Sequence, residues 1–304
     1  MTDRSSSSEP TLSVVVATRE GWPGIRPCIE SLRGQVEAVG GQLVVADGSG
    51  RPVPGTSEVG DRVEWLRRDG ASVFELSHIS YGAARAPIIA ITEDHCTVRA
   101  GWCAGILRAH ADHPDAVAIG GAIENGSTDT ALDWASYYIT QGPFQAPLAN
   151  GPADRIATEA NLSFKRSALD SVHFEAGFGS IILFDLIALR ESGAILVNDD
   201  RLVVDHFQSL PFAVTSMIHF HNGRTIAAFQ RRHLGGVGLI RILALPVLPA
   251  YRSWRAIRIA LAKGRLRRNL VDAIPGIVWL EYCHAAGEGV GYATGAGRSP
   301  FALR

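Results

Sequence analysis

Residues 11–18 have the sequence TLSVVVAT, an apolar run that ends where charged side chains begin. Its length and β-branched content are typical of a strand buried on both faces of a sheet. Similar runs follow at 42–47 (QLVVAD), 63–67, 88–92 (IIAIT) and 116–123. Between them, apolar residues recur with helical spacing at 24–36, 79–86 and 101–110. This alternation predicts an α/β fold, with a mostly parallel sheet flanked by helices on both faces.

The composition suits a folded protein of 304 residues, of which 46% are hydrophobic. Residues 1–10 are polar and serine-rich, so we expect this N-terminus to be disordered. It has no basic segment followed by an apolar run, and therefore predicts no secretory signal. None of the four cysteines forms a C-x-x-C pair, which favours reduced thiols in a cytoplasmic protein.

Charge is distributed unevenly along the chain. Residues 1–205 contain 16 Lys/Arg and 27 Asp/Glu, whereas residues 206–304 contain 13 basic and 3 acidic residues. Between Asp205 and Asp272 there are eleven basic residues and no acidic one. Such asymmetry predicts a C-terminal segment that meets an anionic surface.

Polar clusters follow three of the predicted strands. They are Thr18-Arg19-Glu20, Asp47-Gly48-Ser49 and Glu93-Asp94-His95. In open α/β sheets, ligands bind outside the carboxyl ends of the strands, so these clusters are candidate site residues. Each cluster taken alone could be a solvated turn.

The third cluster has the chemistry of a cation site. Magnesium and manganese prefer oxygen ligands and keep several waters beside one or two carboxylates. Glu93 and Asp94 supply the carboxylates, and His95 adds an imidazole that suits manganese better than magnesium. Such a cation neutralises the charge that develops on a diphosphate leaving group.

Four segments resemble family-two glycosyltransferases with the GT-A fold, and they occur in that family's order. LSVVVATREGWPGIRPCIESLRGQ (12–35) is similar to the first strand and helix, and VVADGS (44–49) to the second strand. SYGAARAPIIAITEDHCTVRAGW (80–102) resembles the stretch with the D-x-D-type metal motif, and NLSFKRSAL (161–169) the acceptor-side strand and helix. The resemblance covers roughly residues 11–206. It implies a GT-A domain at 11–223, with a Rossmann-like nucleotide-binding half and an acceptor half, and a helical tail at 224–304.

The resemblance also implies roles for individual residues. Asp47 matches the acid that contacts the nucleotide base, Glu93 the acid near the ribose, and Asp94 the metal-binding carboxylate. The loop that lines the nucleoside contains Thr18, Arg19 and Glu20. Arg85 lies where the family often has a basic residue near the diphosphate; the alternative is an arginine on a helix surface.

Three further assignments depart from the usual motif. The family's Glu-Asp pair with the catalytic base is missing from residues 179–193, where Phe184-Asp185 makes Asp185 the candidate base and Glu175 the second choice. His206 ends the sequence VVDH and resembles a position near the metal or diphosphate, with a structural histidine as the alternative. His95 replaces a third carboxylate and either ligates the metal or faces solvent.

The basic tail contains two apolar segments that are too short or too interrupted to cross a bilayer. Residues 253–270 mix Trp, Ile and Leu with seven basic residues across 252–268, which predicts an amphipathic helix in the headgroup region of an anionic membrane. The alternative is that the tail packs on the catalytic domain. A nucleic-acid partner is not predicted, because the motifs of such proteins are missing.

Together these features predict a metal-dependent, inverting transferase that moves a sugar from a nucleoside-diphosphate sugar to a hydroxyl acceptor. The tail favours a lipid-linked or surface-polysaccharide acceptor and a peripheral position at the cytoplasmic face of the membrane. Two competing hypotheses remain open. One is a nucleotidyltransferase, and the other is a non-catalytic relative that only binds nucleotide sugars.

Overall fold

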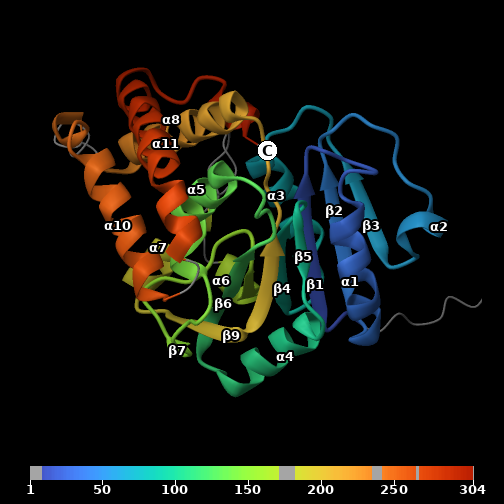
Figure 1. Cartoon of the computed structure of the whole chain (residues 1–304). Helices are drawn as coiled ribbons and strands as arrows, with labels where there is room; N and C mark the ends of the chain where they lie inside the picture. The colour runs from blue at the N-terminus through green and yellow to red at the C-terminus, as the bar shows by residue number, and fades with distance from the viewer. Residues whose placement is uncertain (1–8, 171–181, 235–241, 265–266, 304) are drawn as a thin grey trace, which may run out of the picture. The chain divides into compact units, whose positions relative to one another are not determined.

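The computed structural model describes residues 9–170, 182–234, 242–264 and 267–303 (Figure 1). Most of the predicted disordered N-terminus, residues 1–10, therefore lies outside the described residues. The chain forms two compact units, one from residues 1–122 and 148–204 and the other from 123–147 and 205–304. Each unit thus combines segments that are far apart in the sequence.

The first half of the sheet is parallel. It comprises β1 (Leu12–Thr18), β2 (Gln42–Asp47), β3 (Val63–Arg67) and β4 (Ile88–Glu93). The order is β3-β2-β1-β4, and β1 and β2 are almost entirely buried. Continuous apolar runs form β1 and β2 because both of their faces are covered, whereas β3 is only half-buried.

The other strands extend the sheet beyond β4. They are β5 (Cys96–Val98), β6 (Ala116–Asn125), β7 (Gly151–Pro152), β8 (Leu162–Lys165) and β9 (Ile195–His206). The order continues β4-β8-β6-β9-β5, with β7 paired to β9. Because β8 runs antiparallel to both β4 and β6, the sheet is mixed beyond its parallel half. The predicted α/β class, a sheet flanked by helices, is confirmed.

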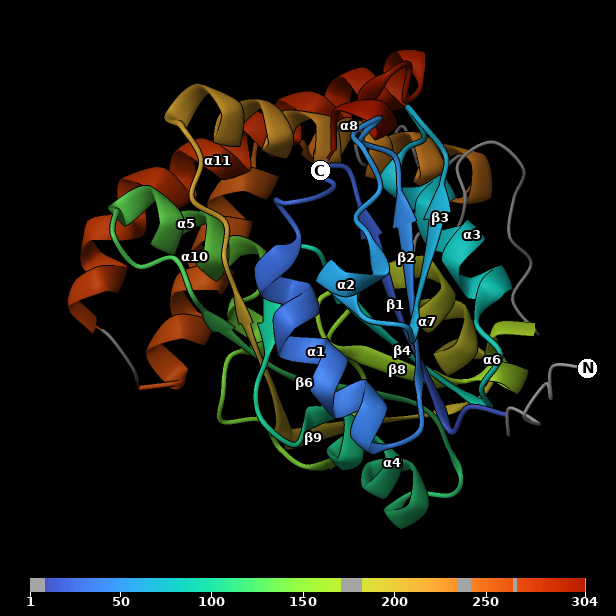
Figure 2. The same cartoon turned by 90° about the vertical axis from the view of Figure 1, so that its right-hand side faces the viewer.

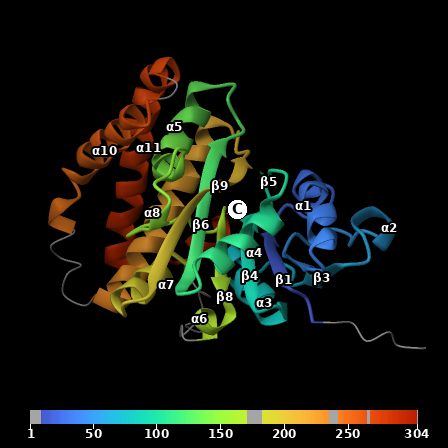
Figure 3. The same cartoon turned by 90° about the horizontal axis from the view of Figure 1, so that it is seen from below.

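Helices cover both faces of the sheet in the first unit (Figures 2 and 3). They are α1 (Arg26–Ala38), α2 (Thr56–Val59), α3 (Val73–Ala83), α4 (Trp102–Asp112), α6 (Arg166–Asp170) and α7 (Ile182–Glu191). On one face, Tyr81 of α3 and Leu186 of α7 share a core with Val15 of β1. The other face is covered by α1, which contacts α4.

Helix α3 differs from its predicted span of 79–86. It begins at Val73 because Ser72 and Glu75 form a capping box, in which the Ser72 hydroxyl accepts from the Glu75 amide and the Glu75 carboxylate accepts from the Ser72 amide. It ends at Ala83, and the chain is extended at Ala84. The capping signal was present in the sequence as Ser-x-x-Glu.

The second unit is helical. It contains α5 (Ala131–Thr140), η1 (Gly142–Phe144), α8 (Phe212–Leu234), α10 (Leu248–Ala262), α11 (Arg267–Thr294) and η2 (Ser299–Ala302). The predicted helical C-terminal region is therefore present. Helices α8 and α11 approach so closely that a Cβ at Gly223 would collide with the His284 carbonyl.

The tail helices pack on a segment from the middle of the chain. A Cβ added at Gly276 of α11 would lie 2.7 Å from the Cβ of Ala135 in α5. Lys263 donates hydrogen bonds to the carbonyls of Gln145 and Pro147, at 2.6 and 2.5 Å. The predicted boundary at residue 223 falls inside α8, because this helix continues to Leu234.

A membrane-spanning helix is not found among the described residues, since none of their helices combines the length and the apolar content that a bilayer crossing requires.

Candidate active site

The three predicted polar clusters meet at one edge of the parallel sheet. Thr18, the last residue of β1, is paired with Asp47, the last residue of β2. On the other side of β1, Ala17 is paired with Glu93 at the end of β4. The carboxyl ends of these strands therefore bring the clusters together, as the sequence predicts.

A buried hydrogen bond connects the first and third clusters. The Thr18 hydroxyl donates to Oδ2 of Asp94 at 2.7 Å. The same hydroxyl oxygen accepts the backbone amides of Glu20 at 3.1 Å and Gly21 at 3.0 Å. Thr18 thus turns the loop after β1 and fixes one oxygen of Asp94, while Arg19 and Glu20 of that loop stay half-buried.

Asp47 anchors the second cluster and is fully buried. Its Oδ1 accepts the Ser49 amide at 2.7 Å, and its Oδ2 accepts the Trp65 indole at 3.1 Å. Gly21, with φ 63°, lies against Ser49 so closely that any side chain there would collide with it. The loop after β1 therefore contacts the loop after β2 at Gly21, and no other residue could replace this glycine without strain.

His95 faces the two acidic residues that precede it. Its Nδ1 lies 2.8 Å from Oδ1 of Asp94, and its Nε2 lies 3.4 Å from Oε2 of Glu93. Burial opposes protonation of His95, but the hydrogen bond to Asp94 and the charges of Glu93, Asp94 and Glu20 raise its pKa to about 9. In this geometry the ring orients Asp94, and direct ligation by His95 stays a prediction.

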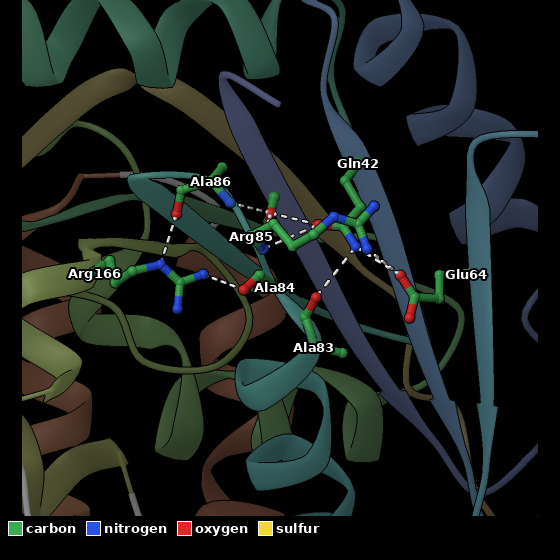
Figure 4. Close-up of polar contacts among 8 residues, drawn as sticks. Gln42, Glu64, Ala83, Ala84, Arg85, Ala86 and Arg166 are labelled. Carbon is green, nitrogen blue, oxygen red and sulfur yellow. Dashed lines mark hydrogen bonds and ion pairs between the residues drawn. The ribbon is translucent and has the colours of Figure 1, made fainter. Parts of the chain in front are cut away.

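Arg85 lies at the opposite edge of the sheet. Its amide donates to the Ser13 hydroxyl and to Oε1 of Gln42, each at 3.1 Å, and both of these residues are at strand beginnings (Figure 4). Its guanidinium donates to Oε2 of Glu64 at 2.9 Å. A strand of six residues spans about 20 Å, so the predicted role of Arg85 near the diphosphate is wrong.

We expect the substitution Arg85→Ala to leave nucleoside-diphosphate affinity unchanged, because the side chain is at the far edge. The ion pair with Glu64 is exposed, so the cost to unfolding free energy should stay within about 1 kcal/mol. Isothermal titration calorimetry and urea unfolding would measure the two quantities. A tenfold loss of affinity would restore the diphosphate role.

Asp185 lies in the first turn of α7. Its Oδ2 is buried and has no hydrogen-bond partner among the described residues. Burial and the charge of Glu159 raise the pKa of Asp185 to about 7. A carboxyl group that titrates near neutral pH can accept a proton from a hydroxyl, so this environment suits a general base.

Glu175 and His206 belong to other parts of the chain than the strand ends described above. Glu175, the second candidate for the base, lies outside the described residues. His206 is the last residue of β9, is 5% exposed and accepts the Gly126 amide through its carbonyl at 2.8 Å. Because His206 belongs to the second unit, its predicted metal role stays a prediction.

Glu159 is a candidate site residue that the sequence did not reveal. It precedes β8 next to Ala160, whose carbonyl accepts the Thr92 hydroxyl of β4 at 2.9 Å. Burial and the charge of Glu93 raise the pKa of Glu159, and burial together with the charge of Glu159 raises the pKa of Asp185. Glu159 therefore connects the candidate base electrostatically to the acidic edge.

No protein-family model matches the sequence, and no curated protein does either. Among the solved structures that match part of this chain is a crystal structure of GalNAc-T7 with UDP, GalNAc and Mn2+, at 12% sequence identity and a TM-score of 0.47. The match covers 66% of this chain and 44% of that one, so it spans less than half of the other chain.

The donor set at the edge is compatible with a divalent cation. Asp94 is 9% exposed, and among the described residues each of its oxygens makes one hydrogen bond, which leaves a second lone pair on each for a cation. Glu93 is half-buried beside it. Carboxylates held in this way, with room for waters, suit magnesium or manganese.

Proposed function

We propose that the chain is a glycosyltransferase that moves a sugar from a nucleoside-diphosphate sugar to a hydroxyl acceptor. The observation that carries the proposal is the buried hydrogen bond from Thr18 to Asp94, next to Asp47. It joins the ends of β1 and β4, and strand pairing places Asp47 of β2 next to Thr18, so three strand ends form one acidic edge, where α/β sheets bind nucleotides. The four sequence segments that resemble family-two glycosyltransferases agree with this function.

The donor would lie along this edge. Asp47 would contact the base, Glu93 the ribose, and the loop of Thr18, Arg19 and Glu20 would line the nucleoside. Asp94 would hold a manganese or magnesium ion, with His95 and His206 as further candidate ligands. When bound, the cation supplies positive charge that stabilises the diphosphate as it leaves.

Asp185 would act on the acceptor. Its carboxylate would take the proton of the acceptor hydroxyl while that oxygen attacks the anomeric carbon. The bond between the anomeric carbon and the diphosphate oxygen breaks, and the nucleoside diphosphate leaves with the electron pair. Attack opposite to the leaving group inverts the anomeric centre.

We further propose a lipid-linked or surface-polysaccharide precursor as the acceptor, and a peripheral position at the cytoplasmic face of a membrane. The support is the basic C-terminal region, with eleven basic residues and no acidic one between Asp205 and Asp272. A hydroxyl acceptor embedded in a bilayer would require the enzyme to work at that surface.

Substituting Asp94→Asn is expected to weaken nucleoside-diphosphate binding in manganese by about 100-fold, or ~2.8 kcal/mol. Asparagine keeps an oxygen for the Thr18 hydroxyl but removes the charge that holds the cation. Titration calorimetry with UDP and GDP, with and without manganese, measures the effect. Asp69→Asn is the matched control, because Asp69 is exposed. Among the described residues its carboxylate is paired only with Arg67.

Equal affinities of wild type and Asp94→Asn would contradict the cation site. A binding-competent wild type that neither hydrolyses nor transfers any donor sugar would instead favour the non-catalytic hypothesis. Transfer of the nucleotidyl group to a sugar phosphate would identify a nucleotidyltransferase. Melting temperatures of both variants close to wild type would show that the fold is kept.

A further inference from the structure

One face of α10 carries aromatic and basic side chains with nothing described over them. The exposed residues Tyr251, Trp254, Arg255, Arg258 and Leu261 define this α10 face. At 100° per residue they fall within about 120° of the helix circumference. The opposite side of α10 is buried through Pro249, Ser253, Ala256 and Ala260. In an ordinary amphipathic helix the exposed side is polar, whereas the exposed side of α10 is both apolar and cationic.

The side chains of the α10 face are arranged as one surface. The rings of Tyr251 and Trp254 are 5.9 Å apart, and the Arg258 guanidinium lies 4.9 Å from the centre of the Trp254 ring. Both aromatic residues are about half exposed, at 53% and 51%. Leu243 and Val247, just before α10, are 75% and 68% exposed. A soluble surface rarely gathers so much large apolar area without a partner.

The basic residues of α10 differ in their surroundings. Arg252 is bound to Glu288 of α11, so it belongs to the interior of the second unit. Arg255 and Arg258 are exposed, and α10 itself contains no acidic residue. Glu281 of α11 is only 5% exposed, and burial raises its pKa to about 7 against the opposing charges of Arg252 and Arg255. The α10 face is thus positively charged towards its surroundings.

We propose that the α10 face docks the protein on an anionic lipid surface. Tyrosine and tryptophan place their rings at the level of the lipid headgroups, and leucine and valine reach the acyl boundary. Arg255 and Arg258 meet the lipid phosphates, since arginine matches phosphate oxygens well. This inference rests on the peripheral membrane position proposed above and names the surface that makes the contact, and it does not depend on the donor site.

A second copy of the chain suits this face less well. In a symmetric dimer the same patch meets itself, so Arg255 and Arg258 of both copies would come together without acids between them. Like charges brought together in this way are destabilising. An anionic membrane satisfies the apolar and the cationic groups at the same time.

The test is sedimentation of the full chain with vesicles. Wild type is expected to bind vesicles of phosphatidylglycerol and phosphatidylcholine, and to bind pure phosphatidylcholine weakly. The double substitution Arg255→Gln/Arg258→Gln should weaken binding to the anionic vesicles about 30-fold, at ~1 kcal/mol per arginine. Trp254→Ala should weaken binding to both vesicle types, because it removes apolar burial. Binding should fall at 1 M salt, where charges are screened over about 3 Å.

Trp279→Ala is the matched control. Trp279 is 48% exposed on α11 of the same unit and stacks on Phe212. Unchanged binding of Trp279→Ala, with losses in the α10 variants, supports the proposal. Wild type that ignores anionic vesicles, or α10 variants that bind like wild type, would overturn it, as would dimers that Trp254→Ala dissociates. Nucleoside-diphosphate affinity measured on the same variants separates this outcome from failure of the donor site.

Discussion

Substitution of Asp185 by asparagine is expected to slow sugar transfer by about 10²–10⁴-fold, the usual contribution of a positioned general base. Donor affinity should hardly change, because the donor residues belong to other elements. Transfer by wild type should rise with pH through about 7, where Asp185 loses its proton. Initial rates at saturating donor between pH 5.5 and 8.5, together with calorimetry of donor binding, measure these effects.

The same substitution should stabilise the fold at high pH. The folded protein holds a proton on Asp185 up to about pH 7, whereas an unfolded carboxyl loses it near 3.8. Between these values the unfolded state binds fewer protons, so stability falls as pH rises and the full penalty is present above pH 7. Asp185→Asn removes it and should gain about 1–3 kcal/mol at pH 8, with little difference at pH 3.5.

Glu191→Gln serves as the control, because Glu191 ends the same helix and is exposed. It should change neither rate nor stability by more than a small factor. A variant Asp185→Asn that transfers sugar at the wild-type rate would remove Asp185 from the mechanism. If Glu175→Gln were then the slow variant, the base would be Glu175.

The second large effect concerns the core of the helical unit. Arg252 of α10 and Glu288 of α11 form two hydrogen bonds of 2.8 Å, and Glu288 is 2% exposed. Arg252→Met leaves the buried carboxylate without its counter-charge and should cost about 3–5 kcal/mol of unfolding free energy. Urea unfolding followed by circular dichroism measures it.

The double variant Arg252→Met/Glu288→Leu tests the cause. Removing both charges should recover much of the loss, because replacement of a buried pair by apolar residues is often neutral. Arg255→Met is the matched control on the exposed side of α10, with a change within about 0.5 kcal/mol. If Arg252→Met matched Arg255→Met, the ion pair would not be stabilising.

Much of the sheet could be predicted from the sequence, because strands buried on both faces leave unmistakable apolar runs. Residues 42–47 and 63–67 match β2 and β3 at both ends. The meeting of Thr18, Asp47 and Glu93 followed from the same pattern, since parallel strands carry their last residues to one edge. Family resemblance added the roles, and those remain proposals.

Arg85 shows where the sequence misled. It lies just upstream of the strand that ends in Glu93, where the resemblance to family-two glycosyltransferases implies a basic residue near the diphosphate. A strand separates its two ends, however, and Arg85 stays at the beginning of β4 with Ser13 and Gln42. Glu159 was missed for the opposite reason, because only the antiparallel pairing of β8 with β4 brings it near Glu93.

The partner of the tail was equally hidden from the sequence. The charge of residues 224–304 favoured membrane contact, with packing on the catalytic domain as the alternative, and these residues share a compact unit with residues 123–147. Charged side chains indicate which side of a helix is exposed. They do not indicate which segment, distant in the sequence, packs on the buried side.

This pairing has a consequence for synthesis on the ribosome. Helix α5 packs on α11, where Ala135 lies against Gly276, so this side of α5 has no partner until α11 has been made. At about 5–20 residues per second, translation from residue 140 to residue 290 takes roughly 10–30 s. For that time α5 lacks its partner helix, so we expect a chaperone to hold this part of the nascent chain.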